Sequence, residues 1–310
     1  MRSYFVIFNG TAGRGRAARS QTKVEQAFQA AGVECELVAT DGRGHAEELA
    51  YAAVRDGWPA VVAVGGDGIV HEVANGLMRG VSGADAPTVP LGIIAVGSGN
   101  DFVKMLGTPV HQPEAAVRRI VAADPRGIDI GRVTAHDSGG GPEGVWYFTN
   151  GVGVGFDAQV AAHARRVQHL RGAAIYGWAI VKTLKELRSP SIQIIVDGRE
   201  VAHERLLLTT VSNGPCHGGS FWLCPGASLD DGMLDVLTAK ARSLPAVLNL
   251  LPRVVFGKHL GQWGVQLHRG AKVVVRSDAR LPIHADGEIV AEWVRELEIE
   301  VLPGRLTVLA

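Results

Sequence analysis

Two glycine-rich turns with acidic residues carry the clearest chemical signal in this sequence. One apolar run ends in Gly65-Gly66-Asp67-Gly68 and a second in Gly97-Ser98-Gly99-Asn100-Asp101, and a helical pattern follows each turn. Glycines let a phosphate approach the backbone, and the N–H groups at a helix start attract anions. Mg²⁺ is usually held by one or two carboxylates together with phosphate oxygens. The turns therefore predict a phosphate site at which Asp67 helps to hold a metal ion.

The acidic residues of these turns could instead have a purely structural role. Asp is a favoured N-cap, worth about 1 kcal/mol, and Asn100 and Asp101 could also be caps. A third turn, Asn9-Gly10-Thr11-Ala12-Gly13, follows the first apolar run and could join the same site or be an ordinary turn. A GxGxxA pattern from Gly13 to Ala18 lies too far past the predicted strand for a good dinucleotide fingerprint, and the P-loop pattern GxxxxGK[ST] occurs nowhere.

Alternating strands and helices must position these turns. The predicted strands cover residues 4–8, 35–39, 60–64 and 91–96, and the predicted helices cover 17–31, 46–55 and the stretches after the two turns. Apolar strands that alternate with helices predict a parallel sheet covered on both faces. Turns that follow parallel strands line a crevice at the carboxyl edge of the sheet.

The pattern changes after about residue 128. Short strands are predicted at 145–150, 192–196, 205–212, 234–238, 272–276, 281–284 and 297–301, with helical stretches near 158–188 and 243–256. The glycine run at 137–144 is predicted to be a loop near the junction. The sequence thus predicts a β-rich second domain, followed by a last strand, 304–310, that could pair with either domain.

Composition excludes several classes of protein. The chain has 310 residues, equal numbers of Lys+Arg and Asp+Glu, and 40 glycines without a period. A global basic field for nucleic acid is therefore absent. The three cysteines have no CxxC spacing, so neither a disulfide framework nor a zinc cluster is expected. No signal peptide and no stretch of about 18 apolar residues is found, which predicts a cytoplasmic protein.

Five segments resemble the diacylglycerol kinase catalytic family, which includes bacterial lipid kinases, sphingosine kinases and ceramide kinases. The segments are GGDGIVHEVANGL (65–77), PLGIIAVGSGNDFVKMLG (90–107), NGVGVGFDAQV (150–160), SNGPCHGGSFWLCPGASLDDGMLDVL (212–237) and HADGEIV (284–290). They follow the family order and span nearly the whole chain. The resemblance implies a lipid kinase that transfers the γ-phosphoryl group of ATP, with Mg²⁺, to a lipid hydroxyl in lipid metabolism and phospholipid synthesis.

The same resemblance implies a fold and domain boundaries. It predicts an α/β nucleotide-binding domain with a parallel sheet, like NAD kinase and diacylglycerol kinase, at 1–128, to which residues from about 302 to 310 return. It predicts a C-terminal β-sandwich domain for the lipid substrate at 129–301. The oligomeric state stays open.

Site residues follow from the resemblance one by one. Glu288 corresponds to the general base, and Asp286 and Asp67 would help to place metal and water. The residues implied to contact ATP are Asn9, Gly10, Thr11, Ala12, Gly13, Thr40, Gly65, Gly66, Asp67, Gly68, Ile69, Val70, His71 and Ser98. Without the family, Asp286-Gly287 would indicate a two-residue hairpin turn.

A structural Mg²⁺ loop is also implied by the resemblance of SLDDGMLD (228–235) to bacterial members. Its ligands would be the Asp231 side chain and the backbone carbonyls of Ser228 and Met233. Oxygen ligands suit a hard cation. The alternative is a solvated acidic turn.

The sequence departs from the family at two positions. Bacterial members mostly have threonine and asparagine where this chain has Ile69 and His71, so a hydroxyl and an amide near the phosphates are lost. Sphingosine kinases have a similar pattern, which hints at a long-chain base as acceptor. Diacylglycerol, a sphingoid base, phosphatidylglycerol and a polyprenol-type alcohol all stay open as acceptors.

Two apolar and basic stretches could dock on an anionic membrane, which predicts a peripheral location on the inner membrane face. The first is the stripe Ala173, Tyr176, Gly177, Ile180, Leu184 and Leu187, surrounded by Arg165, Arg166, Arg171, Lys182, Lys185 and Arg188. The second covers residues 244–263. Packing against the β-rich domain is the alternative for both.

Two rival functions remain. The chain could be a lipid- or nucleotide-binding module without turnover, which only Ile69 and His71 support. A nicotinamide-dependent dehydrogenase is the other rival, and the missing GxGxxG pattern counts against it.

Overall fold

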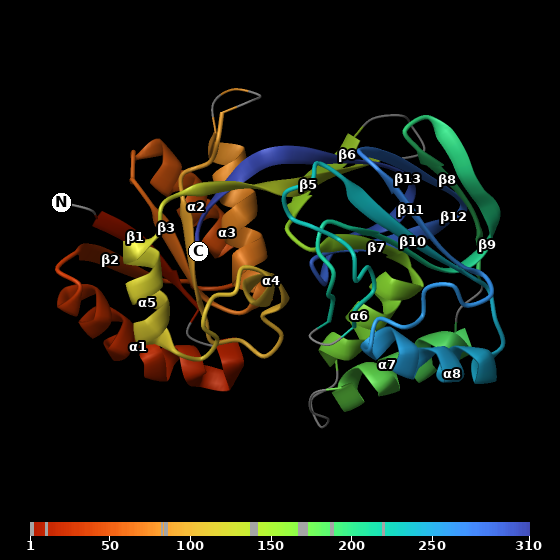
Figure 1. The fold of residues 1–310 in the computed structure, drawn as a ribbon, viewed down its shortest axis with the longest axis horizontal. Coiled ribbons are helices and arrows are strands. Elements are labelled where there is room, and N and C mark those ends of the chain that lie inside the picture. The colour runs from red at the N-terminus through yellow and green to blue at the C-terminus, as the bar shows by residue number, and fades with distance from the viewer. Residues whose placement is uncertain are drawn as a thin grey trace. The chain divides into compact units, whose positions relative to one another are not determined.

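The computed structural model describes residues 3–9, 12–81, 83, 86–136, 142–166, 173–186, 189–218 and 221–310. This part of the chain divides into two compact units, residues 1–130 with 303–310 and residues 131–302. The chain passes from one unit to the other within β5 (Arg126–His136) and returns within β13 (Glu288–Leu309). Figure 1 labels the helices and strands of both units.

A sheet of parallel strands forms the centre of the first unit. Its strands are β1 (Ser3–Phe8), β2 (Glu34–Ala39), β3 (Val61–Gly65) and β4 (Leu91–Ala95), in the order β2-β1-β3-β4. The end of β13 joins β4 in parallel, with Val308 opposite Leu91. The last segment of the chain thus pairs with the first unit, one of the two options that the sequence left open.

Helices cover both faces of this sheet. They are α1 (Ala12–Ala30), α2 (His45–Arg55), α3 (Asp67–Gly80), the short α4 (Asp101–Met105) and α5 (Pro113–Ala122). α1 and α5 pack on one face through a core that includes Phe28 and Ile120, while α2 and α3 contact each other and β1 and β3 (Figure 1). Residues on every central strand are buried, as expected for strands covered on both sides.

Antiparallel strands build the second unit. They run in the order β11 (Val265–Gly270), β10 (Leu234–Lys240), β9 (Arg199–Ser212), β7 (Gly151–Gly155), β12 (Lys272–Ala285) and β13. β8 (Ser191–Val196) pairs with β9 and β12, and β6 (Pro142–Phe148) pairs with β5. Apolar residues from these strands form one core, which includes Phe148, Ile194 and Ile283. Three helices, α6 (Phe156–Arg166), α7 (Ala173–Glu186) and α8 (Leu244–Val255), complete the unit.

Several predicted boundaries were wrong. α1 begins at Ala12 and not at residue 17, so Ala12 and Gly13 of the predicted third turn are helical. The strands predicted at 272–276 and 281–284 are one strand, β12, and those at 297–301 and 304–310 are both parts of β13. The middle of β12 is polar, so in the sequence it looks like a break between two strands. The strand nevertheless continues there, with a shift of register between Arg276 and Leu281. Most of the loop predicted at 137–144 lies outside the described residues.

Candidate active site

The two glycine turns of the first unit lie against each other. β3 and β4 are paired in parallel, and the N–H groups of Val96 and Gly97 both donate to the Gly65 carbonyl, at 2.8 and 3.1 Å. A Cβ atom on Gly97 would lie 2.3 Å from the Cα atom of Gly66. This approach of backbone to backbone requires glycine, so at least part of the glycine pattern serves the packing of the turns themselves.

Asp67 joins the two turns through its carboxylate. It is the first residue of α3, and its Oδ2 and Oδ1 atoms accept the backbone N–H groups of Asn100 at 2.7 Å and Asp101 at 2.8 Å. These N–H groups begin α4, so the carboxylate caps that helix and not its own. The interpretation of Asp67 as the N-cap of the helix that follows it was therefore wrong.

Asn100 holds the second turn in its shape. Its φ of 56° lies in the left-handed region, which asparagine tolerates better than most residues. The buried side chain donates from Nδ2 to the Gly97 carbonyl at 2.9 Å. Asn100 occupies the N-cap position of α4, as that alternative predicted, but its side chain makes no capping hydrogen bond. The turn is locked by Asp67 and Asn100 together.

The other residues predicted to bind ATP end the neighbouring strands. Asn9 follows β1 and donates its N–H to Val64, at the end of β3, at 3.1 Å. Thr40 follows β2 and donates its N–H to Phe8, at the end of β1, at 2.9 Å. Ser98 is exposed in the second glycine turn. These residues share the carboxyl edge of one sheet with Asp67, whereas Gly10 and Thr11 lie outside the described residues.

Ile69 and His71 are both buried near the start of α3, with 4% and 7% of their surfaces exposed. Between them Val70 is buried as well, and its N–H donates to the Gly66 carbonyl at 3.3 Å. Burial explains the change at position 69. A buried isoleucine side chain stabilises the fold because it removes apolar surface from water, whereas a buried threonine hydroxyl would need a hydrogen-bond partner. The departure from the family pattern is therefore compatible with a well-packed helix start.

Sequence reasoning missed Glu72, a second carboxylate of α3, which holds the start of α2. Its Oε1 and Oε2 atoms accept the N–H groups of Gly44 at 2.9 Å and Ala46 at 3.2 Å, at the start of α2. α3 thus carries two carboxylates, Asp67 and Glu72, that each cap a different helix. The family segment 65–77 contains both, but their hydrogen-bond partners are distant in sequence, so no local signal could have found them.

In the second unit, Asp286 and Gly287 form a two-residue hairpin turn between β12 and β13. Their φ angles are 52° and 83°, as expected for a turn whose central residues both have positive φ. The Asp286 carboxylate accepts four hydrogen bonds, from the Thr149 N–H and hydroxyl and from the N–H groups of Asn150 and Gly151, at 2.7–3.3 Å. A carboxylate has about four lone-pair positions, so these bonds favour a positioning role over metal binding.

Glu288 follows this turn as the first residue of β13 and lies opposite Ala285 of β12. It is partly exposed, as a proton acceptor that meets a substrate must be. The buried His284, which sequence reasoning did not single out, accepts the Gly287 N–H at its Nδ1 atom at 3.1 Å. Because Nδ1 accepts, the proton of the neutral ring is on Nε2. Asp286 and His284 therefore fix the backbone that carries Glu288.

In the loop predicted to bind a structural Mg²⁺, an arginine side chain contacts the acidic residues. The Oδ1 atom of Asp231 accepts the Met233 N–H at 3.0 Å, and its Oδ2 atom accepts a hydrogen bond from the Arg269 guanidinium. Arg269 Nε also lies 2.7 Å from Oδ1 of the buried Asp235. The opposite charges of this pair attract each other. Burial raises the pKa of Asp235, and the Arg269 charge opposes that effect.

Of the predicted metal ligands, the Asp231 side chain is thus engaged by a guanidinium. The hydroxyl of Ser228 donates to Asp230 at 2.5 Å. In the described part of the chain, no group of three or more His, Cys, Asp and Glu side chains could hold a metal ion. A structural Mg²⁺ in this loop stays a prediction.

We expect Arg269→Met to lower the free energy of unfolding by about 2 kcal/mol, because it leaves the buried Asp235 without a counter-charge. Arg269 is half exposed, which reduces the effect below that of a fully buried pair. Thermal unfolding with and without Mg²⁺, in the absence of nucleotide, is the measurement. A wild-type midpoint that rises with Mg²⁺ would support the predicted structural ion in this loop, whereas an unchanged midpoint would support Arg269 as its cation. Arg276→Met, which breaks the exposed pair with Glu296, is the control.

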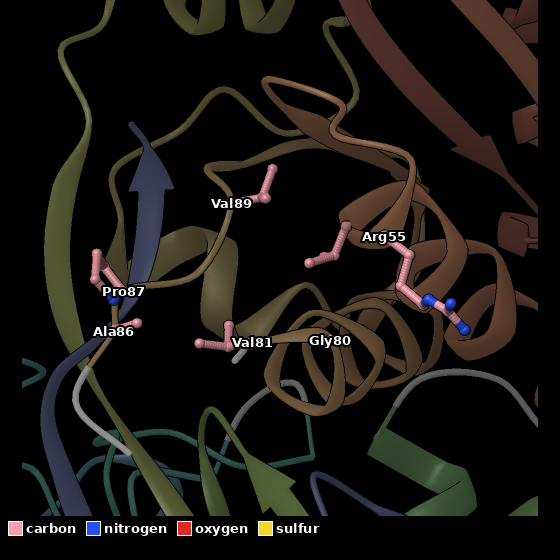
Figure 2. A pocket seen from close by; sticks show the side chains of 7 residues that line it. Arg55, Gly80, Val81, Ala86, Pro87 and Val89 are labelled. Carbon is pink, nitrogen blue, oxygen red and sulfur yellow. The ribbon is translucent and has the colours of Figure 1, made fainter. Parts of the chain in front are cut away.

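A pocket of about 440 Å³ lies at the other end of α3, between Arg55, Gly80 and Pro87 (Figure 2). Its lining residues are apolar or glycine apart from Arg55, and one of them, Val89, precedes β4. The pocket therefore adjoins the amino edge of the parallel sheet, whereas the glycine turns are at the carboxyl edge. It brings together none of the predicted site residues.

No helix within the described ranges is both long enough and apolar enough to cross a membrane. Of the first predicted docking stretch, Arg171, Leu187 and Arg188 lie outside the described residues. Ile180 is buried, in a cluster that joins α6, α7 and α8. Ile180 therefore packs inside the second unit, which confirms for this residue the alternative of packing against the β-rich domain.

Two family models match the chain. The diacylglycerol kinase catalytic domain matches residues 3–133, and the YegS C-terminal NAD kinase beta sandwich-like domain matches residues 150–310. The first covers the glycine turns and Asp67. The second covers Asp286 and Glu288 and supports the predicted β-sandwich.

Relatives and solved structures agree with these matches. A diacylglycerol kinase of Mycobacterium tuberculosis (strain CDC 1551 / Oshkosh) is 31% identical over 98% of this chain and 93% of its own length. A diacylglycerol kinase of Bacillus subtilis (strain 168) is 30% identical over 91% and 88%. The crystal structure of a diacylglycerol kinase from Bacillus anthracis str. Sterne, 20% identical, has a TM-score of 0.72 and covers 99% of this chain and 96% of that chain, which supports the fold.

Proposed function

The chain belongs to the diacylglycerol kinase catalytic family, and from this premise we propose that it is a lipid kinase that transfers the γ-phosphoryl group of ATP to a lipid hydroxyl. One observation carries the proposal beyond family membership. Two glycine turns at the carboxyl edge of a parallel sheet are locked together by the Asp67 carboxylate, which keeps backbone N–H groups and one partly exposed acid side by side.

ATP would bind at this edge of the first unit. The first N–H groups of α3 have no partner within the helix, and the helix start carries partial positive charge, so both favour phosphate oxygens. Asn9, Thr40 and Ser98 end or follow the neighbouring strands and would complete the nucleotide site. Ile69 and Val70 would support the phosphate-binding turn from the core, because both are buried.

Mg²⁺ would be held with the phosphates through Asp67. The fit rests on the partial exposure of this carboxylate and on its place at the start of α3, beside the glycine turn. One carboxylate is enough when phosphates and waters supply the other ligands. When bound, the ion would neutralise charge on the phosphate oxygens.

Glu288 would act as the general base. Its carboxylate would take the proton of the lipid hydroxyl while that oxygen attacks the γ-phosphorus and the bond to ADP breaks, with no covalent enzyme intermediate. Asp286 and His284 would hold the turn that presents Glu288 and would not touch the reacting atoms. This assignment makes Asp286 a positioning residue.

Diacylglycerol is the proposed acceptor, because the relatives from M. tuberculosis and B. subtilis are both named diacylglycerol kinase. A sphingoid base is the second candidate, on the pattern at Ile69 and His71. The enzyme would work from the cytoplasm at the inner face of the membrane.

Transfer of labelled γ-phosphate from ATP, with Mg²⁺ and lipids in mixed micelles, tests the proposal. The panel contains diacylglycerol, a sphingoid base, phosphatidylglycerol and a polyprenol, and we expect diacylglycerol to be phosphorylated. Omission of Mg²⁺ should abolish transfer. Binding of ATP without transfer to any of these lipids would instead support a module that binds nucleotide and lipid without turnover.

A further inference from the structure

Large apolar side chains are exposed around the C-terminal end of α8. Phe256 and Trp263 are 74% and 76% exposed, and Leu248 on α8 and Trp222 are 44% and 45% exposed. Trp222 belongs to the same surface, since its N–H donates to the Val254 carbonyl at 3.2 Å and its Cβ lies close to Gly257. Exposed apolar side chains that gather into one patch mark a site of interaction with a protein, a ligand or a membrane.

The core of the unit does not need these side chains. α8 packs inward through Val247, Val254 and Leu251, which belong to two buried clusters. The segment after α8 is fixed by the buried His259, whose Nε2 atom lies 2.9 Å from the Leu223 carbonyl. Burial lowers the pKa of His259, which therefore remains a neutral donor. The exposed aromatic residues are thus held on a fixed frame.

The segment that carries Leu248, Phe256 and Trp263 is rich in positive charge. Residues 236–277 contain seven Lys and Arg residues and no Asp or Glu, although the whole chain has no net charge. Lys240, Arg269 and Arg276 are paired with acids outside this segment. Arg242, Arg253 and Lys258 form no ion pair with any residue that the structure describes.

Arg242 contacts one of the exposed aromatic rings. Its guanidinium lies over the Trp263 ring, 5.4 Å from the centroid. Its Nε and Nη2 atoms are buried and have no hydrogen-bond acceptor among the described residues. An arginine that supports an exposed tryptophan suits the interface of a bilayer, where the ring enters the head-group layer and nearby positive charge attracts anionic lipids.

We propose that the exposed residues Trp222, Leu248, Phe256 and Trp263, with Arg242, Arg253 and Lys258, form a docking surface for a bilayer that contains anionic phospholipids. The inference rests on the proposed function, because a kinase for a bilayer lipid must reach its acceptor there. Charge complementarity selects this occupant, since a neutral apolar partner would gain nothing from three unpaired cations.

Sedimentation with vesicles tests the surface. Wild-type protein should sediment with vesicles of phosphatidylcholine and phosphatidylglycerol, bind vesicles of pure phosphatidylcholine weakly, and dissociate at high salt. Phe256→Ser with Trp263→Ser should weaken binding more than about tenfold. Arg253→Gln and Lys258→Gln should each weaken it about fivefold. Val145→Ser, which removes an exposed apolar residue of β6, should bind like the wild type.

Activity measurements separate the docking surface from the proposed kinase activity. The Phe256→Ser, Trp263→Ser protein should keep its kcat on lipid in mixed micelles and lose activity on vesicles. Equal sedimentation of this variant and the wild type would overturn the docking surface while leaving the kinase proposal intact. Retention of the wild type by nucleic acid and not by anionic vesicles would overturn it as well. Absence of phosphoryl transfer by the wild type in mixed micelles would instead refute the proposed kinase activity.

Discussion

Replacing Glu288 with Gln is expected to lower kcat by roughly 100- to 10,000-fold, because the amide cannot accept the hydroxyl proton as phosphoryl transfer begins. The change keeps the size and the strand position of the side chain. ATP affinity should hardly change, since the residues proposed to hold the nucleotide are in the first unit. The measurement is kcat on diacylglycerol in mixed micelles together with the Kd for ATP.

Glu292→Gln is the matched control for this prediction. Glu292 is an exposed glutamate of the same strand, β13, and its substitution should leave kcat unchanged. If Glu288→Gln keeps more than about a tenth of the wild-type kcat, another group takes the proton and the assignment fails.

Replacing Gly97 with Ala is expected to have the second large effect. The new Cβ would lie 2.3 Å from the Gly66 Cα atom, and neither backbone can rotate away as a flexible side chain could. The two turns must therefore separate, at a cost of about 1–3 kcal/mol or more, as in overpacked cores. A displacement of about 1 Å at the phosphates should lower kcat/KM roughly 100-fold.

Thermal unfolding and ATP titration check this prediction. Gly226→Ala is the control, because a Cβ atom there meets nothing within 4 Å. It should leave both the unfolding midpoint and the Kd for ATP close to the wild-type values. A Gly97→Ala protein that binds ATP normally would show that the contact between the turns does not shape the nucleotide site.

Local sequence predicted parts of both sites. The apolar runs at 60–64 and 91–96 and the glycines after them predicted two strand ends at one edge of a sheet, and β3 and β4 are neighbours there. Burial on both faces leaves few alternatives for such strands. The Asp286-Gly287 hairpin is equally local, since few dipeptides favour two consecutive positive φ angles.

Long-range partners were beyond sequence reasoning. Asp67 was expected to hold a metal ion, which stays a proposal, or to cap its own helix. It caps α4 instead of its own helix, and its bond to Asn100 spans 33 residues. Asp286 was expected to help place metal and water, which is untested, and nothing in the sequence indicated its hydrogen bonds to the segment 149–151, far earlier in the chain. A carboxylate looks the same in a sequence whether it meets a metal ion, a backbone N–H or an arginine.

The sequence by itself determined the alternation of strands and helices, the glycine turns, the family and the acid-free segment 236–277. Each of these depends on residue order over short distances or on composition. The tertiary structure decided which donors meet Asp67 and Asp286, that Arg269 occupies the acidic loop, and that Phe256 and Trp263 remain exposed while Ile180 is buried. These outcomes depend on which distant segments pack together, because hydrogen-bond partners and burial are fixed only when the chain closes on itself.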